Sequence, residues 1–182
     1  LLTAIACHTS KVRLGTGVLV LPMRNPAVLA KEAATLDVIS KGRLVLGMAS
    51  GWYAREFDAV GIPFKKRGDI FDRNLEILTR LWTEDMVTGE SPPHDLRKAV
   101  LHPKPIQKPR PPILIGGYAE RVLKRTAEKG DGWLTYFYTP DAYTRSMDRI
   151  RKFAEDAGRD PDSLDSLNQI PIMVTESDKD RK

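Results

Sequence analysis

The chain has 182 residues, of which 41% are hydrophobic and 29% are charged, and its formal net charge is +5. This composition is typical of a globular domain large enough to bury a core, and no apolar run reaches the roughly 18 residues that a membrane-spanning helix needs. The basic residues are dispersed, without zinc-finger spacing or an RNA-binding aromatic motif. That pattern argues against nucleic acid as a partner, and a mild attraction to anionic ligands is the most that the charge supports.

The cysteine content and the first residues bear on the compartment. Cys7 is the single cysteine, so no intrachain disulfide is possible, and we expect a cytoplasmic protein. Its neighbours Leu2, Ile5 and Ala6 predict a buried structural thiol rather than a nucleophile. The chain starts without Met and has no basic region ahead of a long apolar run, so we expect no signal peptide.

Short apolar runs alternate with helical patterns along the chain, after a possible leading helix over residues 1–9. The sequence predicts, in chain order, a strand over 11–22, a helix over 25–42, a strand over 43–50, a helix over 66–82, a strand over 111–117, a helix over 119–130, a strand over 132–138, a helix over 140–158 and a strand over 169–174. Alternation of this kind is typical of a parallel sheet with right-handed crossovers.

Residues 84–111 interrupt the alternation. This stretch is rich in proline and has little periodicity, so we expect an extended insertion with one short strand near "AVLHP", residues 99–103. The alternation itself fits two α/β folds, an open doubly wound sheet and a (β/α)8 barrel. A barrel needs about 250 residues, so under that hypothesis strands are missing and the chain is a fragment.

The stretch "ILIGGYAER" joins a strand to a helix through two glycines. Amide groups in the first turn of a helix lack partners within the helix, and the helix dipole is positive there. Glycine lets a phosphate approach the backbone, which makes Gly116, Gly117, Tyr118 and Ala119 a candidate phosphate cradle. A plain tight turn is the alternative.

Two other glycine-containing segments lie at strands. Gly15 and Gly17 interrupt "LGTGVLVLP", which indicates either a bulge or the close approach of a ligand. In "LGMASGWYAREF", Gly51 ends a strand where ligands bind in βα folds. Trp52 is then a candidate pocket wall and Arg55 a candidate anion contact, or Trp52 simply packs on a neighbouring helix.

Other chemistries find little support in the sequence. The three histidines, His8, His94 and His102, have no metal-ligand spacing with one another or with Cys7, so no metal is expected. There is no Gly-x-Ser-x-Gly nucleophile elbow either.

Taken together and in this order, the segments resemble the bacterial luciferase-like oxidoreductase family, and within it the subgroup that uses the deazaflavin coenzyme F420. The matching blocks are residues 9–69, Leu81-Trp82 and residues 101–133. The resemblance implies a (β/α)8 TIM barrel, incomplete here, with about five of its eight strands. Residues 1–182 would form a single partial barrel domain, roughly the third to seventh strands, with the insertion near 84–111.

The resemblance also implies roles for individual residues. The loop matching Gly116 to Ala119 would hold the cofactor phosphate through backbone N–H groups. A non-proline cis peptide is implied at Gly17-Val18, where it would support the central ring of the flavin. Gly51, Trp52 and Arg55 would lie at the same cofactor site, with Arg24 and Arg55 facing an acidic cofactor tail.

For the chemistry, the resemblance implies hydride transfer to or from F420 on a small organic substrate, with Tyr136 as a proton donor. The alternatives are an FMN-dependent monooxygenase that uses O2 and a non-catalytic flavin-binding protein, and a homodimer is possible. Trp52 stands where the sugar-phosphate dehydrogenases of the family carry a glutamate, which argues against a glucose-6-phosphate type of activity. Arg73 stands where many relatives carry an acidic residue; we expect it on a helix surface and assign it no function.

Overall fold

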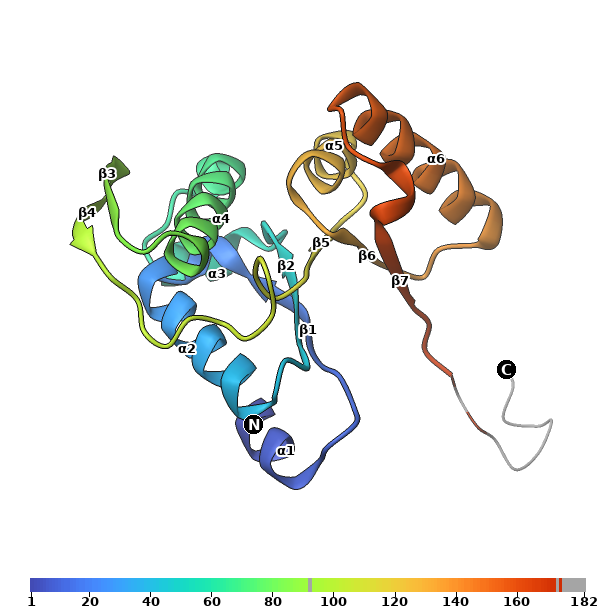
Figure 1. The fold of residues 1–182 in the computed structure, drawn as a ribbon. Helices are drawn as coiled ribbons and strands as arrows, with labels where there is room; N and C mark the ends of the chain where they lie inside the picture. The colour runs from blue at the N-terminus through green and yellow to red at the C-terminus, as the bar shows by residue number, and fades with distance from the viewer. Residues whose placement is uncertain (92, 173, 175–182) are drawn as a thin grey trace. The chain divides into compact units, whose positions relative to one another are not determined.

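The structure is a computed structural model that describes residues 1–91, 93–172 and 174. It divides into two compact units, Leu1–Gly116 and Gly117–Lys182, which are described separately below (Figure 1).

The first unit contains a parallel sheet in which β2 pairs with both β1 and β5. Its helices and strands are α1 (Leu2–His8), β1 (Leu14–Val20), η1 (Leu21–Met23), α2 (Pro26–Ile39), β2 (Leu44–Ala49), α3 (Ala54–Ala59), η2 (Phe64–Lys66), α4 (Arg67–Thr83), β3 (Val87–Ser91), β4 (His94–Ala99) and β5 (Ile113–Gly116). The expected strands, the crossover helices and the leading helix are therefore present in this unit.

Helices α2 and α4 pack together as their sequences predict. Asn25 caps α2, because its side-chain oxygen accepts hydrogen bonds from the N–H groups of Ala27 and Val28 at 3.0 and 3.2 Å. In α4 the apolar stripe is buried and ends at Trp82, whose Nε1 donates to the Ala30 carbonyl of α2 at 2.9 Å. This bond satisfies a polar group inside an otherwise apolar interface.

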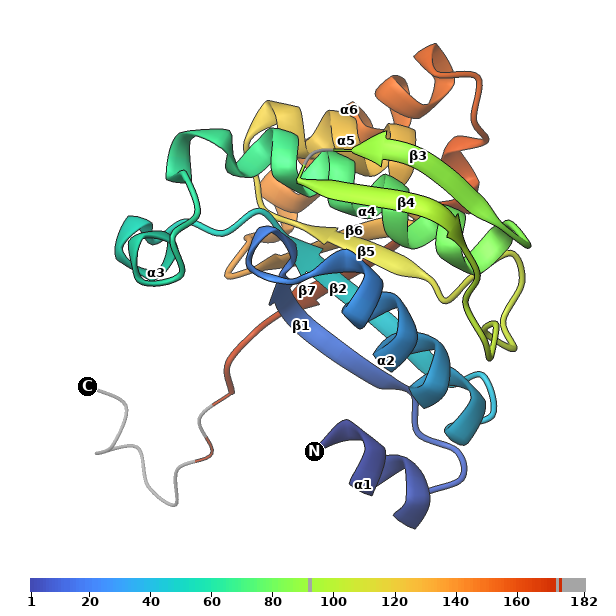
Figure 2. The ribbon, with the colours of Figure 1, turned by 90° about the vertical axis from the view of Figure 1, so that its left-hand side faces the viewer.

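The insertion after α4 differs from the prediction. It holds an antiparallel hairpin of β3 and β4, which runs along α4 in Figure 2. The insertion therefore has two strands instead of the one expected near residues 99–103, and the second of them ends at Ala99. These strands are polar and bury no continuous apolar face, so their sequence lacks the alternation that marks a strand. The proline-rich stretch that follows is anchored by buried Asp37, which accepts hydrogen bonds from the N–H groups of Ile106 and Gln107.

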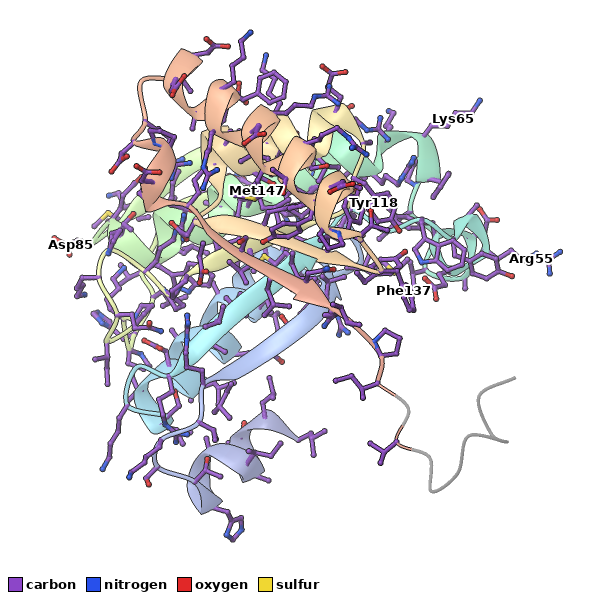
Figure 3. All side chains as sticks on the ribbon, turned by 90° about the vertical axis from the view of Figure 1, so that its right-hand side faces the viewer. Arg55, Lys65, Asp85, Tyr118, Phe137 and Met147 are labelled. Atoms are coloured by element: carbon purple, nitrogen blue, oxygen red, sulfur yellow. The ribbon has the colours of Figure 1, made fainter. Side chains whose placement is uncertain are left out.

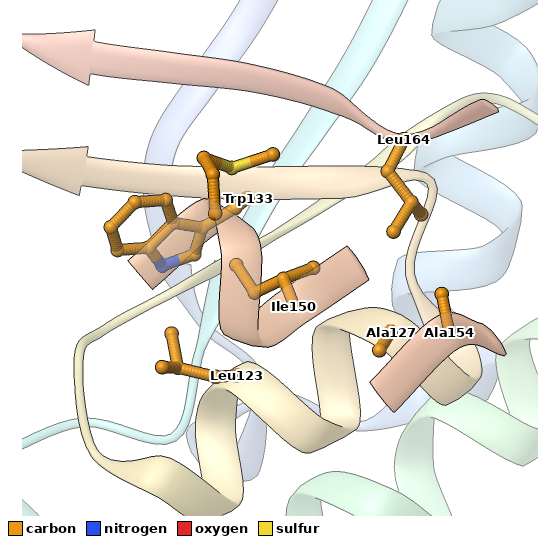
Figure 4. Close-up of a cluster of buried hydrophobic side chains, with 7 residues drawn as sticks. Leu123, Ala127, Trp133, Ile150, Ala154 and Leu164 are labelled. Atoms are coloured by element: carbon orange, nitrogen blue, oxygen red, sulfur yellow. The ribbon is translucent and has the colours of Figure 1, made fainter. Parts of the chain in front are cut away.

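The second unit is a smaller α/β layer built on two parallel strands. Its elements are α5 (Glu120–Lys129), β6 (Gly132–Tyr136), α6 (Pro140–Asp156), η3 (Pro161–Ser163) and β7 (Asp165–Gln169). Figure 4 shows its core, in which Trp133 of β6 packs with Leu123 of α5 and Ile150 of α6. The inward stripe predicted for α6 is confirmed, since Met147, Ile150 and Ala154 are buried.

Two further expectations are corrected. The last strand, expected over 169–174, is instead β7, which ends at Gln169, although residue 173 lies outside the described residues. The apolar run "QIPIMV" contains a proline, which cannot donate to a strand ladder, whereas β7 is polar and was not recognisable by hydrophobicity. Cys7 is exposed rather than buried, because α1 is short and buries only Ala6.

Candidate cofactor site

In the first unit, the end of β1 lies against the last residue of β5. The pairing of β1 with β2 shifts register between Thr16 and Leu19, which confirms the bulge, and the Gly17-Val18 peptide is cis, as the resemblance implied. A Cβ atom added to Gly116 would stand 2.9 Å from Cγ1 of Val18. The Val18 side chain therefore fills the space that the missing side chain at Gly116 leaves.

The turn at Gly51 is fixed by packing, but the side chains that follow it point outward. Gly51 has φ +80°, and a Cβ there would lie 2.8 Å from the Phe57 ring, so only glycine fits without rearrangement. Trp52 is 81% exposed and contacts the Tyr53 ring at 5.4 Å between centroids. Arg55 is also exposed and projects outward in Figure 3.

In the second unit, Gly117 is held on both sides by β6. Its N–H donates to the Leu134 carbonyl at 3.3 Å, and its own carbonyl accepts from Nε1 of Trp133 at 2.7 Å. Gly117 has φ +126°, a conformation that L side chains rarely adopt. Trp133 and Leu134 of β6 thus fix the turn ahead of α5.

Helix α5 starts without a side-chain cap. Ala119 occupies the N-cap position and offers no hydrogen-bond acceptor, so the amide groups of the first turn receive no side-chain partner. Because the N–H of Gly117 is already engaged, the amide groups available to an anion are those that follow it. Free amides and the positive end of the helix dipole suit a phosphate group, and the site therefore fits the phosphate end of a flavin-type cofactor.

Aromatic side chains gather next to this helix start. The Tyr118 hydroxyl donates a hydrogen bond to the Tyr136 hydroxyl, and the Tyr118 ring stacks on Tyr138 at 5.8 Å. Partial burial and the bond to Tyr136 raise the pKa of Tyr118 to about 12. Phe137 continues the cluster, 69% exposed and with φ +57°, a backbone conformation that is rare for bulky residues. Tyr118 and Phe137 are labelled in Figure 3.

The described residues offer little support for other kinds of site. Among residues 1–91, 93–172 and 174, no group of three or more His, Cys, Asp or Glu side chains is arranged to hold a metal ion. No helix within the same residues is long and apolar enough to cross a membrane.

Parallel strands, crossover helices and glycine turns at strand ends define an α/β-barrel type of protein with its candidate site at the carboxyl ends of the strands. Residues 1–182 match the family model described as luciferase-like monooxygenase. The chain belongs to this family. Its fold is accordingly the luciferase-like barrel, of which it holds five parallel strands, and the doubly wound alternative is excluded.

Individual relatives include both reductases and monooxygenases. The phthiodiolone/phenolphthiodiolone dimycocerosates ketoreductase of Mycobacterium tuberculosis is 33% identical over 159 residues, 85% of this chain and 41% of that protein. Among solved structures, the coenzyme F420-dependent tetrahydromethanopterin reductase of Methanopyrus kandleri has a TM-score of 0.80 and 27% identity, covering 92% of this chain and 52% of that one. Monooxygenase RslO1 of Streptomyces bottropensis has a TM-score of 0.81 and 29% identity, covering 91% and 52%.

The chain thus spans about half the length of the relatives it matches. The family and these neighbours establish an F420- or FMN-dependent class of oxidoreductase or monooxygenase at the level of the family. Sequence reasoning missed the indole bond to Gly117 and the cluster around Phe137. The run of aromatic residues that follows Gly132 was the available signal for both.

Proposed function

We propose that the protein is an oxidoreductase that transfers a hydride between coenzyme F420 and a small organic carbonyl or activated double bond. The observation that carries this proposal is the uncapped start of α5 behind a glycine turn that β6 already fixes. The likeness to an F420-dependent reductase and to a ketoreductase supports the choice of cofactor and of reaction. When bound, the deazaflavin supplies or receives the hydride.

The residues of the chain bind, orient and hold protons in this proposal. Backbone amides after Gly117 would bind the cofactor phosphate, and the bulge at Gly17-Val18, together with Gly116, would support the ring. Gly51, Trp52 and Arg55 would border the site.

Tyr136 is the proposed proton donor. A tyrosine hydroxyl both donates and accepts, so Tyr136 can accept a hydrogen bond from Tyr118 and at the same time donate its own O–H to a substrate oxygen. A tyrosine hydroxyl is protonated at neutral pH in any case, and the raised pKa of Tyr118, about 12, extends its protonated state to alkaline pH. A carbonyl oxygen that gains negative charge during hydride transfer would be stabilised by such a donor.

The exposed aromatic residues indicate the kind of substrate. The ring of Tyr136 and the neighbouring Phe137 are exposed and offer apolar surface at the proposed donor hydroxyl, and neither side chain carries a charge that would favour a phosphorylated sugar. We therefore expect an apolar ketone, or the corresponding alcohol, as substrate. Arg24 and Arg55 are both exposed in the first unit and would face the acidic tail of the cofactor.

A second candidate is an FMN-dependent monooxygenase. The 29% identity to monooxygenase RslO1 favours it. The same phosphate cradle would serve FMN, so the two functions differ in the cofactor ring and in the use of O2.

The test is a parallel titration of the full-length protein with oxidised F420 and with FMN, followed by fluorescence. Tight binding of F420 alone supports the proposal, whereas tight binding of FMN alone favours the monooxygenase. Gly117→Ala should weaken binding of either cofactor. Gly158→Ala is the matched control, because Gly158 also has positive φ in the second unit but has open space around it. If neither cofactor binds, the phosphate cradle is wrong.

A further inference from the structure

A second feature of the first unit lies apart from the glycine turns. It is a pocket of about 420 Å³ between η1, the start of α2, residues 61–66, α4 and the tip of the β3–β4 hairpin. Pro22, Ile62 and Ile70 give it apolar walls. None of the residues assigned above to the cofactor ring or phosphate lines it, but Arg24, which was assigned to the acidic tail of the cofactor, does.

The charge in this pocket has one sign. Arg24, Lys66, Arg73 and His94 line it, and the lining contains no carboxylate among the residues that the structure describes. Arg24 and Lys66 are exposed at its edge, while Arg73 and His94 are half-buried. The sequence predicted Arg73 on the surface of a helix and assigned it no function; in the structure Arg73 is half-buried on α4 and lines this pocket.

Two polar atoms here lack hydrogen-bond partners within the described part of the chain. Nε of Arg73 is buried without an acceptor, and Oδ1 of Asn74, a residue that is 2% exposed, is buried without a donor. The other end of the Asn74 amide is engaged, since Nδ2 donates to the carbonyls of Leu21 and Arg24. Buried polar groups are nearly always hydrogen-bonded in folded proteins, and exceptions point to a water molecule or an ion.

The pKa of His94 reflects its position next to Arg73. Burial and the positive charge of Arg73 both lower the pKa of His94. A carboxylate near the imidazole would have the opposite effect. At neutral pH the imidazole is therefore uncharged, and the positive charge of the pocket comes from the two arginines and Lys66.

We propose that this pocket binds a multiply charged oxyanion, a phosphate or a cluster of carboxylates, with the Arg73 guanidinium as its principal donor. A planar guanidinium matches the geometry of carboxylate and phosphate oxygens. An oxyanion would accept from Nε of Arg73 and neutralise the positive charge of the pocket, while Lys66 and Arg24 would contribute charge from the edge. A phosphate ligand at this pocket would be independent of the proposed function, whereas a carboxylate tail would rest on it.

The same oxyanion chemistry has two possible sources, a free phosphate and the carboxylate-rich tail of a polyglutamylated cofactor. We would follow the His94 imidazole resonances of the full-length protein by NMR, over a range of pH, with inorganic phosphate in one arm and triglutamate in the other. His8 and His102 lie outside this pocket and serve as internal references. An anion should raise the pKa of His94, because it favours the imidazolium form.

Arg73→Gln should weaken the binding of the effective anion about tenfold or more, since it removes a charged hydrogen-bond donor. It should also raise the pKa of His94 in the absence of any anion. Arg97→Gln is the matched control. Arg97 lies on β4 together with His94, but its side chain is 86% exposed and does not line the pocket.

The titrations with the two anions distinguish the possible ligands. A response to phosphate assigns the site to a phosphate ligand, and a response to triglutamate alone assigns it to a carboxylate tail; both support an oxyanion site. The inference is overturned if neither anion moves the His94 resonances. It is equally overturned if Arg73→Gln binds the anion as well as the Arg97→Gln control, in which case water alone satisfies Arg73.

Discussion

The contact between Gly116 and Val18 makes a quantitative prediction. Gly116→Ala would add a Cβ at 2.9 Å from Cγ1 of Val18, 3.4 Å from Cβ of Ala49 and 3.5 Å from the Met48 carbonyl oxygen. Real Cβ atoms are essentially never found below 3.0 Å from such neighbours, so Val18 must move. Overpacking of this kind costs about 1–3 kcal/mol, and we expect the free energy of unfolding to fall by that amount.

A double mutant isolates the cause. Val18→Ala removes the clashing methyl group and, because Val18 is 39% exposed, should cost little by itself. Combined with Gly116→Ala it should restore most of the lost stability, with a favourable coupling of about 1 kcal/mol or more. Urea unfolding of the full-length wild type, both single mutants and the double mutant measures this coupling.

Two results would refute the reasoning. In the first, Gly116→Ala unfolds at the same urea concentration as the wild type. In the second, the free energy of unfolding of the double mutant falls by the sum of the decreases in the two single mutants. If the coupling is found, the affinity of Gly116→Ala for the cofactor becomes informative, because the displaced Val18 belongs to the proposed support of the ring.

Three further predictions concern the packing around the site. Asp37→Ala should lower the free energy of unfolding by about 3 kcal/mol, because it leaves two amides of the proline-rich stretch without their buried charged acceptor; urea unfolding measures this, and an unchanged midpoint would contradict it. Trp133→Phe should weaken cofactor binding about threefold to tenfold through loss of the bond to the Gly117 carbonyl, as fluorescence titration would reveal, and equal affinity would show that the turn needs no such bond. The pKa of Tyr118 is raised to about 12 in the folded state, so the unfolded chain loses this proton at lower pH than the folded protein does. The free energy of unfolding should therefore fall as pH rises from about 10 towards 12. Tyr118→Phe should flatten this pH dependence in urea unfolding, and the same dependence in the variant and the wild type would contradict the raised pKa of Tyr118.

Periodicity predicted those parts of the fold that bury a continuous apolar face. Helices α4 and α6 lie within a few residues of their expected ranges, because each places a stripe of large side chains against neighbouring elements. Strands β3, β4 and β7 escaped recognition for the opposite reason. They are polar and are defined by pairing with a partner strand, which hydrophobic patterns do not encode.

The sequence predicted the glycine turns of the candidate site. Gly51 and Gly117 follow predicted strands and so indicated turns in a conformation that glycine adopts more easily than other residues; both have positive φ in the structure. The identity of the available amides was not predictable, because it depends on contacts of Gly117 with Leu134 and Trp133, far along the sequence. The surroundings of Arg73 could not be predicted either, because residues from α4, η1 and the hairpin, which are distant in sequence, line its pocket.

The double anchoring of Gly117 determines how the start of α5 behaves towards any ligand. Both polar groups of this residue are tied to β6, whose Trp133 is itself held in the core of the second unit. The turn therefore acquires its shape when that core forms, before a ligand arrives. Little conformational freedom remains to be lost on binding, so affinity at this position is decided by charge and fit rather than by the ordering of a loop.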